Sequence, residues 1–308
     1  MTYRDALPQL DRDLLFLTDG GLETDLIFRR GIDLPHFAAC ALLLTNSGRA
    51  MLRDYYRDFA TLAMERGAGF VLDTVTWRAN PDWLRELGYA PESLVELNRA
   101  AVDLAVGVRA EFRRPGLPIP ISGVLGPRGD GYRPGQLQSV DEARSYHSAQ
   151  IEILADTAAD LVTAMSINYP AEGAGIAIAA RELGMPVAIS FTVETDGRLA
   201  TGETLAQAID AVDELSDFWP AYYMVNCCHP SHLPAELESL DRVRGYRANA
   251  SALSHAELDE SEQLDAGDPV ELGAQIRELR DRAPQFTILG GCCGTDIRHL
   301  RQIAAATA

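Results

Sequence analysis

Four of the five cysteines in this 308-residue chain form two adjacent pairs that lie far apart in sequence. One pair, Cys227 and Cys228, and the other, Cys292 and Cys293, each follow an apolar run of strand length. Adjacent cysteines in so long a chain do not resemble a secreted disulfide framework, whereas thiolates are preferred ligands of soft metal ions such as zinc. The two pairs therefore indicate a metal centre, provided that the fold brings them together.

Two kinds of zinc site use such ligands. Three thiolates with one open position form a catalytic site, whereas four thiolates form a closed structural site. Two readings without a metal stay open. Free cysteines also pack as small buried hydrophobes, and a disulfide could join the pairs, although it would suit a reducing compartment poorly. The fifth cysteine, Cys40, lies in an apolar run and is predicted to belong to the core.

The segments that must position these cysteines alternate between strand-length apolar runs and longer stretches of helical periodicity. The predicted strands are residues 14–18, 69–74, 119–122, 161–166, 186–191, 221–226, 244–249 and 286–289. The predicted helices are residues 47–66, 91–112, 140–158, 172–183, 204–215 and 270–282. This order predicts an α/β fold, a single (β/α)8 barrel of the TIM type over residues 1–308. An open doubly wound sheet is the competing fold, but no Gly-x-Gly-x-x-Gly follows the first strand.

In such a barrel the residues that follow the strands line one common mouth. The first cysteine pair follows the sixth strand and the second pair follows the eighth, so the fold would bring them together. Neighbouring strand residues point to opposite faces, so Cys292 and Cys293 can bind one ion only if the backbone leaves strand geometry there. Gly290, Gly291 and Gly294 would allow this. The Gly- and Pro-rich segment 127–138 is predicted to be a long loop at the same mouth.

Composition excludes several classes of partner. With 45 acidic and 27 basic residues the formal net charge is −18, and such a surface repels nucleic acid and anionic membranes. The N-terminus has no basic flank before an apolar stretch, and the longest early apolar run, 37–44, is too short to cross a bilayer. We therefore expect a soluble, cytoplasmic protein. No nucleic-acid or membrane partner is expected, and a homo-oligomer stays open.

Five segments carry a resemblance to a known family. Val225-Asn226-Cys227 and Gly290-Gly291-Cys292-Cys293-Gly294-Thr295 look like the two zinc motifs of the homocysteine S-methyltransferase family, which includes betaine-, S-methylmethionine- and folate-dependent enzymes. Residues 18–24, Thr-Asp-Gly-Gly-Leu-Glu-Thr, resemble its opening turn. Residues 122–127 resemble its strand-three loop, and residues 248–250 resemble its strand-seven end. The resemblance runs from about residue 14 to residue 303, and Gly-Gly-Cys-Cys-Gly-Thr is its most specific motif.

The resemblance implies that Cys227, Cys292 and Cys293 hold zinc (Zn2+) and that the acceptor's sulfur takes the fourth position. Coordination removes the proton from a thiol, so the bound sulfur could attack a methyl donor and no side chain need act as nucleophile. By resemblance Asp19 helps to hold the acceptor's ammonium, and from its place at the mouth Trp77 could cover a cationic donor. The full set of candidate substrate-binding residues is Asp19, Gly20, Gly21, Thr76, Trp77, Ser166 and Asn249.

One position departs from the family pattern. Ser166 stands where relatives carry a glutamate that helps to bind the amine of homocysteine, and sequence alone places neither Glu172 nor Glu194 as its substitute. The chain ends soon after Ile303, so we expect no cobalamin or folate module. The sequence predicts methyl transfer from a small onium donor (S-methylmethionine, S-adenosylmethionine or a betaine) to homocysteine, giving methionine. The alternatives are methyl transfer to or from a different thiol and, outside enzymes, a zinc-thiolate protein for redox sensing or metal storage.

Overall fold

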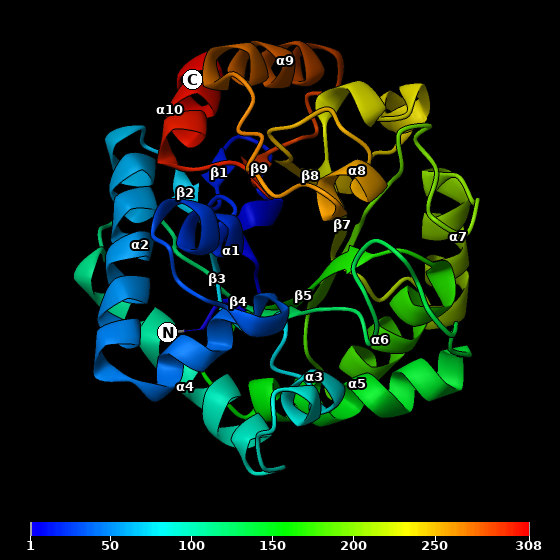
Figure 1. The fold of residues 1–308 in the computed structure, drawn as a ribbon. Coiled ribbons are helices and arrows are strands. Elements are labelled where there is room, and N and C mark those ends of the chain that lie inside the picture. The colour runs from blue at the N-terminus through cyan, green and yellow to red at the C-terminus, as the bar shows by residue number, and fades with distance from the viewer. Residues whose placement is uncertain (1, 308) are drawn as a thin grey trace.

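Nine parallel strands form one sheet that curls into a nearly closed barrel in the computed structural model, which describes residues 2–307 (Figure 1). The order of the strands is β2-β1-β9-β8-β7-β6-β5-β4-β3. They are β1 (Phe16–Leu17), β2 (Gly69–Phe70), β3 (Leu72–Asp73), β4 (Ile121–Leu125), β5 (Leu161–Ile167), β6 (Val187–Phe191), β7 (Tyr222–Cys228), β8 (Val243–Ala248) and β9 (Ile288–Gly291).

The barrel is closed by a single segment of the chain. Residues 69–74 were predicted as one strand, but the structure divides them into β2 and β3, which are separated by Val71. β2 pairs with β1, and β3 pairs with β4, so this segment connects the two edges of the sheet. The predicted (β/α)8 barrel is confirmed. It has nine strands instead of eight because the predicted second strand is divided into β2 and β3.

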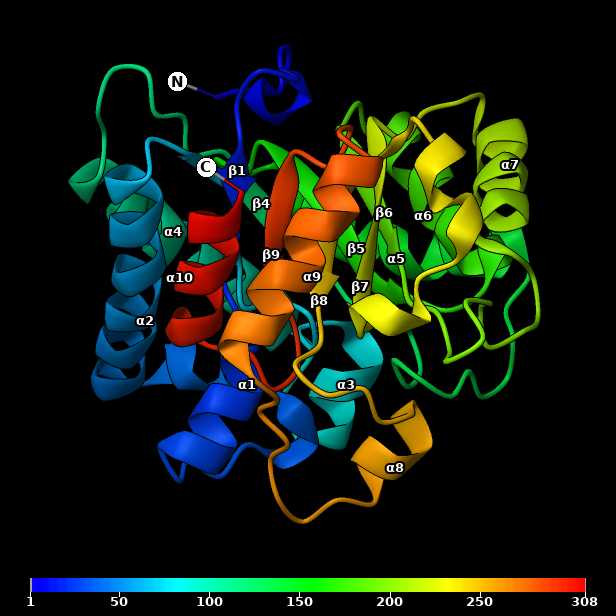
Figure 2. The same ribbon diagram turned by 90° about the horizontal axis from the view of Figure 1, so that it is seen from above.

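The helices surround the barrel wall, and three short ones lie at one end of it. Figure 2 shows α1, α3 and α8 at the end toward which β7 points, which is the mouth that faces the viewer in Figure 1. Within residues 2–307, no helix combines the length and the hydrophobicity that crossing a bilayer requires. The helices are α1 (Leu22–Thr24), α2 (Asn46–Glu65), α3 (Pro81–Glu86), α4 (Ser93–Glu111), α5 (Val140–Ala155), α6 (Pro170–Glu182), α7 (Leu205–Ser216), α8 (His255–Asp259), α9 (Pro269–Arg282) and α10 (Ile297–Ala306).

Capping boxes determine where two of the wall helices begin. The side chain of Ser139 accepts a hydrogen bond from the backbone of Glu142 at the start of α5, and the Glu142 carboxylate accepts one in return. Thr204 and Gln207 form the same arrangement at the start of α7. Such boxes satisfy backbone N–H groups that have no partner inside the helix. The long loop after β4 therefore ends at Ser139 and lies at the mouth, as predicted.

Apolar side chains fill the inside of the barrel at the end opposite the mouth. They form a cluster of their own, separate from the large core between the barrel and its helices. Because this end is packed solid, as is usual in such barrels, the space available to a ligand lies among the residues that follow the strands. The cluster consists of Leu7, Phe16, Val71, Leu161, Ala188, Tyr222, Met224 and Ile288.

Candidate metal centre and substrate pocket

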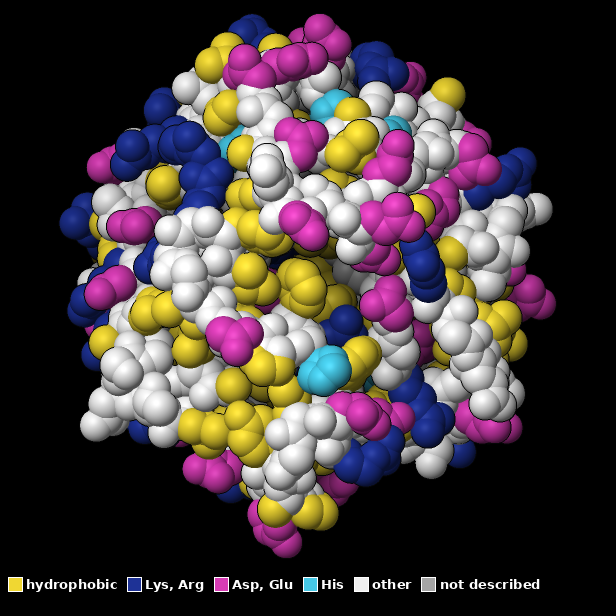
Figure 3. Space-filling view, viewed as in Figure 1, with side chains coloured by type: hydrophobic (Ala, Val, Ile, Leu, Met, Phe, Trp, Pro, Cys, Tyr) yellow, Lys and Arg dark blue, Asp and Glu magenta, His cyan; other side chains and the backbone are white. Residues whose placement is uncertain are grey.

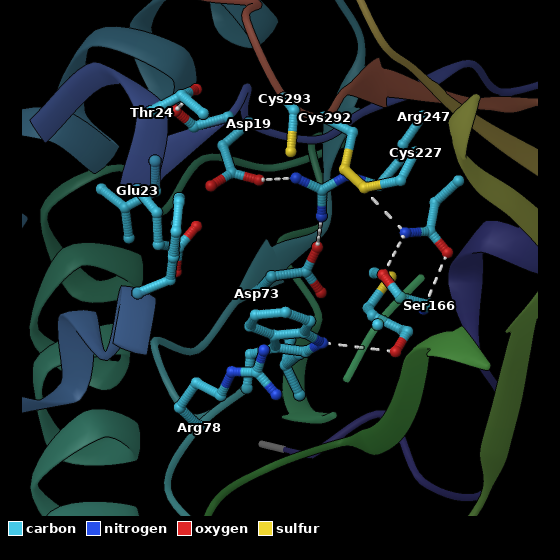
Figure 4. A pocket seen from close by; sticks show the side chains of 18 of the residues that line it. Asp19, Glu23, Thr24, Asp73, Arg78, Ser166, Cys227, Arg247, Cys292 and Cys293 are labelled. Atoms are coloured by element: carbon cyan, nitrogen blue, oxygen red, sulfur yellow. Dashed lines mark hydrogen bonds and ion pairs between the residues drawn. A yellow bond between two sulfur atoms is a disulfide. The ribbon is translucent and has the colours of Figure 1, made fainter. Parts of the chain in front are cut away.

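Three cysteine sulfurs meet at the mouth of the barrel (Figure 4). The Sγ atoms of Cys227, Cys292 and Cys293 all lie within 4.8 Å of one another. The predicted convergence of the two cysteine pairs is thereby confirmed. A disulfide joins Cys227 to Cys292, whose Cα atoms are 5.2 Å apart, and Cys293 is free. This bond differs from the expectation that a disulfide between the pairs would be disfavoured, and it follows from the close approach of the ends of β7 and β9.

The three sulfurs fit the requirements of a soft metal ion. Among residues 2–307 they are the one group of at least three cysteine, histidine or acidic side chains close enough together to share an ion. Zinc binds cysteine sulfur at about 2.3 Å, so three ligands around one ion lie within a few ångströms of one another. Reduction of the bond between Cys227 and Cys292 would free both thiols for this role. Three protein ligands leave a fourth tetrahedral position open.

A kink in β7 separates the two adjacent cysteines of the first pair. The register between β7 and β8 shifts between Asn226 and Cys228, and Cys227 adopts a left-handed backbone with a φ of 55°. This conformation is uncommon for residues other than glycine. It turns Cys227 into the mouth, while Cys228 is buried in the core among apolar side chains, where burial raises the pKa of its thiol to about 12. Cys228 therefore serves packing.

The second pair lies in a turn rather than in a strand. β9 ends at Gly291, so Cys292 and Cys293 both leave strand geometry, as predicted. Gly294 follows with a φ of 80°, which glycine adopts without strain. The opening turn packs directly on this one, because a Cβ atom at Gly21 would collide with the carbonyl group of Cys292. The glycines after β1 therefore let the two turns lie against each other.

Asn226 organises the floor of the site. Its Nδ2 donates to Oγ of Ser166 at 2.9 Å, and its Oδ1 accepts from the backbone N–H of Ser166 at 3.0 Å and from the hydroxyl of Ser190 at 2.6 Å. Nδ2 also lies 3.9 Å from Sγ of Cys292. Ser166 has a φ of 60° and lies at a register shift between β5 and β6. Its polar groups on this side are therefore engaged with Asn226.

A buried arginine lies between two carboxylates at the centre of the pocket. Arg247 of β8 forms ion pairs with Asp19 and Asp73, and its Nε donates to the carbonyl of Gly291 at 3.0 Å (Figure 4). Burial raises the pKa of Asp73 to about 6, although Arg247 opposes that rise. We expected Asp19 to hold the acceptor's ammonium, and we did not predict its ion pair with Arg247. A charged residue within an otherwise buried strand was the available signal, because such a charge needs a partner.

A second arginine is stacked between two indole rings. The guanidinium carbon of Arg78 lies 3.9 Å from the ring centroids of both Trp77 and Trp83. Burial lowers the pKa of Arg78 to about 10. The indole N–H of Trp77 donates to the carbonyl of Met165 at 3.3 Å. Trp77, which we expected to cover a cationic donor, thus has one cation over its ring already.

The loop after β4 brings a tyrosine against the sulfurs. The Tyr132 hydroxyl lies 3.3 Å from Sγ of Cys293, and its ring stacks on that of His255 with centroids 4.0 Å apart. His255 is held by Glu194 at 2.9 Å and by the carbonyl of Cys227 at 2.7 Å. Figure 3 shows the mouth hollowed at its centre, with hydrophobic side chains gathered around the opening. Sequence gave no signal for the contact between Tyr132 and Cys293, because it depends on the path of the loop.

The predicted substrate residues divide into two groups. Five of them line the pocket beside the sulfurs, and two do not. Thr76 is fully buried and donates to the carbonyl of Val124 at 2.6 Å, while Asn249 donates to the carbonyl of Cys227 at 3.0 Å. Both side chains therefore support the backbone around the pocket. The residues that line it are Asp19, Gly20, Gly21, Trp77 and Ser166.

Neither glutamate considered as a substitute at position 166 reaches the sulfur pocket. Glu172 accepts from the backbone N–H of Arg128 at 2.8 Å and pairs with His147 at 2.9 Å, where both side chains are buried. Glu194 is bound to His255. The carboxylate that the family pattern places near the acceptor's amine thus has no replacement at either position.

Comparison with known proteins places the chain among methyltransferases. Residues 16–307 match the sequence profile described as homocysteine S-methyltransferase. The homocysteine S-methyltransferase YbgG of Bacillus subtilis is 25% identical over 322 aligned positions, which span 96% of this chain and 95% of YbgG. A methionine synthase of Mycobacterium tuberculosis is 29% identical over 170 positions, 51% of this chain and 13% of that much longer protein.

Solved structures share the fold. The homocysteine methyltransferase MmuM from Escherichia coli in its metallated form superposes with a TM-score of 0.74 at 20% identity, covering 95% of this chain and 96% of that one. Its oxidised form gives a TM-score of 0.76 at 20% identity, with 99% of both chains covered. At this level of identity the likeness establishes the barrel architecture along nearly the whole chain.

Proposed function

Because the chain belongs to the homocysteine S-methyltransferase family and is a methyltransferase, we propose that it moves a methyl group from a small onium donor to the sulfur of homocysteine, giving methionine. The observation that carries this proposal is the meeting of the Cys227, Cys292 and Cys293 sulfurs at the mouth of the barrel. We propose these three as the ligands of zinc. Zinc bound there would keep the acceptor's sulfur deprotonated at neutral pH and oriented toward the donor.

The surrounding residues support a substrate site rather than a closed structural one. Cys228, the fourth cysteine of the two pairs, is buried in the core, so the cluster provides three thiols and leaves one position for a substrate. Tyr132 borders Cys293 and shields the sulfurs from one side. Arg247 holds Asp19 and Asp73 in place in the lining of the pocket. A metal-storage or sensing protein would require no such open position.

The extent of the catalytic domain and the residues around the substrates are proposed on similar grounds. We propose that residues 1–308 form one catalytic domain, since the family match spans residues 16–307. Asp19, Gly20, Gly21, Trp77 and Ser166 are proposed to surround the substrates, since they line the pocket. S-methylmethionine, S-adenosylmethionine and betaines are the donors to test first, because each carries its methyl group on a cationic centre, and the carboxylates of Asp130 and Asp259 also line this pocket.

A different thiol is the second candidate acceptor. Ser166 is engaged by Asn226, and Asp19 is engaged by Arg247. The two positions at which the family pattern predicts carboxylates for the amine of homocysteine are thus a serine and an aspartate that is already paired with Arg247. A thiol without an ammonium group would be compatible with this arrangement.

The test is a reaction with defined substrates. The protein is reduced to open the Cys227–Cys292 bond, loaded with zinc, and incubated with homocysteine and each donor in turn, and methionine is detected by mass spectrometry. Parallel reactions contain other thiols. Formation of methionine supports homocysteine as the acceptor, and methylation of another thiol alone would support the second candidate. The absence of any methylated thiol would overturn the proposed reaction.

A further inference from the structure

One carboxylate in the pocket has no partner in the protein. Glu23 lines the same cavity as the three sulfurs and is partly exposed to it. Among residues 2–307 no arginine, lysine or histidine lies within ion-pair distance of its carboxylate, and no side chain or backbone group donates a hydrogen bond to it from another residue. Burial raises the pKa of Glu23 to about 7. An unpartnered carboxylate in such a place is stabilised when a cation binds beside it.

The other pocket carboxylates are already bound. Asp19 and Asp73 share the guanidinium of Arg247. Asp130 accepts from the backbone N–H groups of Tyr132 and Arg133 at 2.8 and 3.0 Å. Asp259, the remaining one, lies 3.9 Å from Nε of Arg133. Glu23 is therefore the pocket carboxylate that is free to take a positively charged group of a substrate.

Glu23 also lies on the side of the pocket where an acceptor must bind. It belongs to α1, which follows the opening turn, and this turn packs on the carbonyl of Cys292. Glu23 lines the same pocket as Cys292 and Cys293. A thiol substrate whose sulfur joins the cluster would thus place the rest of its short chain near this carboxylate.

We propose that Glu23 binds the α-ammonium group of the acceptor, and that this contact selects an amino-acid thiol over a thiol without an ammonium. This assignment rests on the proposed function and moves recognition of the amine away from Asp19 and Ser166. Arg78 lines the same pocket and has only a distant ion partner, Asp130, at 3.9 Å. Its positive charge is available to the acceptor's carboxylate.

The test compares two acceptors that differ in one group. 4-Mercaptobutanoate is homocysteine without its amino group. For the zinc-loaded Glu23→Gln protein we expect kcat/KM for homocysteine to fall about 10- to 100-fold, the range of a lost hydrogen bond between charged groups. The value for 4-mercaptobutanoate should stay within about twofold of wild type, because this thiol makes no such contact. The preference for homocysteine would thus collapse in the variant.

A matched control changes a carboxylate that is already paired. Asp259→Asn alters another acidic side chain of the pocket. We expect it to preserve the ratio of kcat/KM between the two thiols, because any effect on the shared methyl donor changes both values alike. Thermal unfolding of both variants checks that the fold is intact. If wild type methylates homocysteine but Glu23→Gln keeps the same ratio, Glu23 does not bind the ammonium and the proposed function still stands. If Glu23→Gln instead raises KM for the donor alone, the carboxylate faces the onium group and the assignment is overturned.

Discussion

Asn226 and Ser166 exchange two hydrogen bonds across the floor of the barrel mouth. The Asn226 side chain donates to Oγ of Ser166 at 2.9 Å and accepts from its backbone N–H at 3.0 Å. Ser166 and Cys227, the residue that follows Asn226, both adopt left-handed backbone conformations, with φ angles of 60° and 55°. Such conformations persist where the surrounding structure holds them. The asparagine before the first cysteine thus stabilises the kinks that direct Cys227 into the mouth.

Removal of this asparagine should weaken the fold. Asn226→Ala leaves the N–H of Ser166 and the hydroxyl of Ser190 without their buried acceptor, so the free energy of unfolding should fall by about 2 to 3 kcal/mol. Ser190→Ala removes one of these bonds and should lower it by about 1 kcal/mol. Urea denaturation followed by circular dichroism measures both. Equal stability of the two variants would show that Asn226 does not hold the floor together.

The ligand assignment predicts which cysteines retain metal. After reduction and zinc loading, wild type should keep about one zinc ion per chain. Cys292→Ala should lose it, because two thiolates remain. Cys40→Ala and Cys228→Ala should keep it, since both thiols are buried in the core. Metal analysis after gel filtration provides the measurement. Full zinc occupancy in Cys292→Ala, or its loss in Cys228→Ala, would contradict the assignment.

Replacement of Arg247 should lower the stability of the protein by an amount that depends on pH. Arg247→Met leaves Asp19 and Asp73 as buried charges without a partner, which should lower the free energy of unfolding by about 3 to 5 kcal/mol near pH 8. Protonation of the carboxylates removes these charges. Since Arg247 holds the pKa of Asp73 down to about 6, its loss raises that pKa further, so the difference from wild type should shrink as the pH falls toward about 6. Adding Asp19→Asn and Asp73→Asn to this variant should restore much of the loss. Denaturation at pH 5 and pH 8 checks each of these expectations.

Removal of the Tyr132 hydroxyl should weaken zinc binding without changing the fold. Tyr132→Phe removes the hydroxyl that lies 3.3 Å from Sγ of Cys293 but keeps the ring stacked on His255. Groups that hydrogen-bond to metal ligands typically contribute about 10- to 100-fold to affinity. Competition with a chromogenic chelator should show weaker zinc binding by about tenfold, while the melting temperature stays close to wild type. Unchanged affinity would show that the hydroxyl does not act on the metal ligand.

Removal of the Glu23 charge should stabilise the folded protein. Burial raises the pKa of Glu23 in the folded state to about 7, from an ordinary value of 4.5. The folded protein therefore binds the proton more tightly, so ionisation reduces stability as the pH rises from about 4.5 to 7. Glu23→Gln should be more stable than wild type by roughly 1 to 2 kcal/mol at pH 8 and equal to it near pH 4.5. Thermal unfolding across this range, without metal, tests the sign. The charged or titratable groups that act on Glu23 or feel its charge are Asp19, Arg78, Arg247, Cys40, Tyr55, Tyr56 and Cys293.

Much of the fold was predictable because its signals are local. Apolar runs, helical periodicity and caps such as Ser139 act within a few residues, and together they predict a barrel whose strand ends meet at one mouth. The division of residues 69–74 into two strands was not predictable, since it reflects pairing with β1 on one side and β4 on the other.

The amino-acid sequence by itself determined that each cysteine pair follows a strand of one barrel. It also determined that the glycines around Cys292 and Cys293 allow a turn that presents both of these thiols. Tertiary structure alone decided that Cys227 and not Cys228 faces the mouth, because a register shift against β8 turns one thiol inward and buries the other. It also decided that Arg247 pairs with Asp19 and Asp73 and leaves Glu23 unpaired. Charges find their partners across strands that are distant in sequence, so no local pattern records which carboxylate stays free.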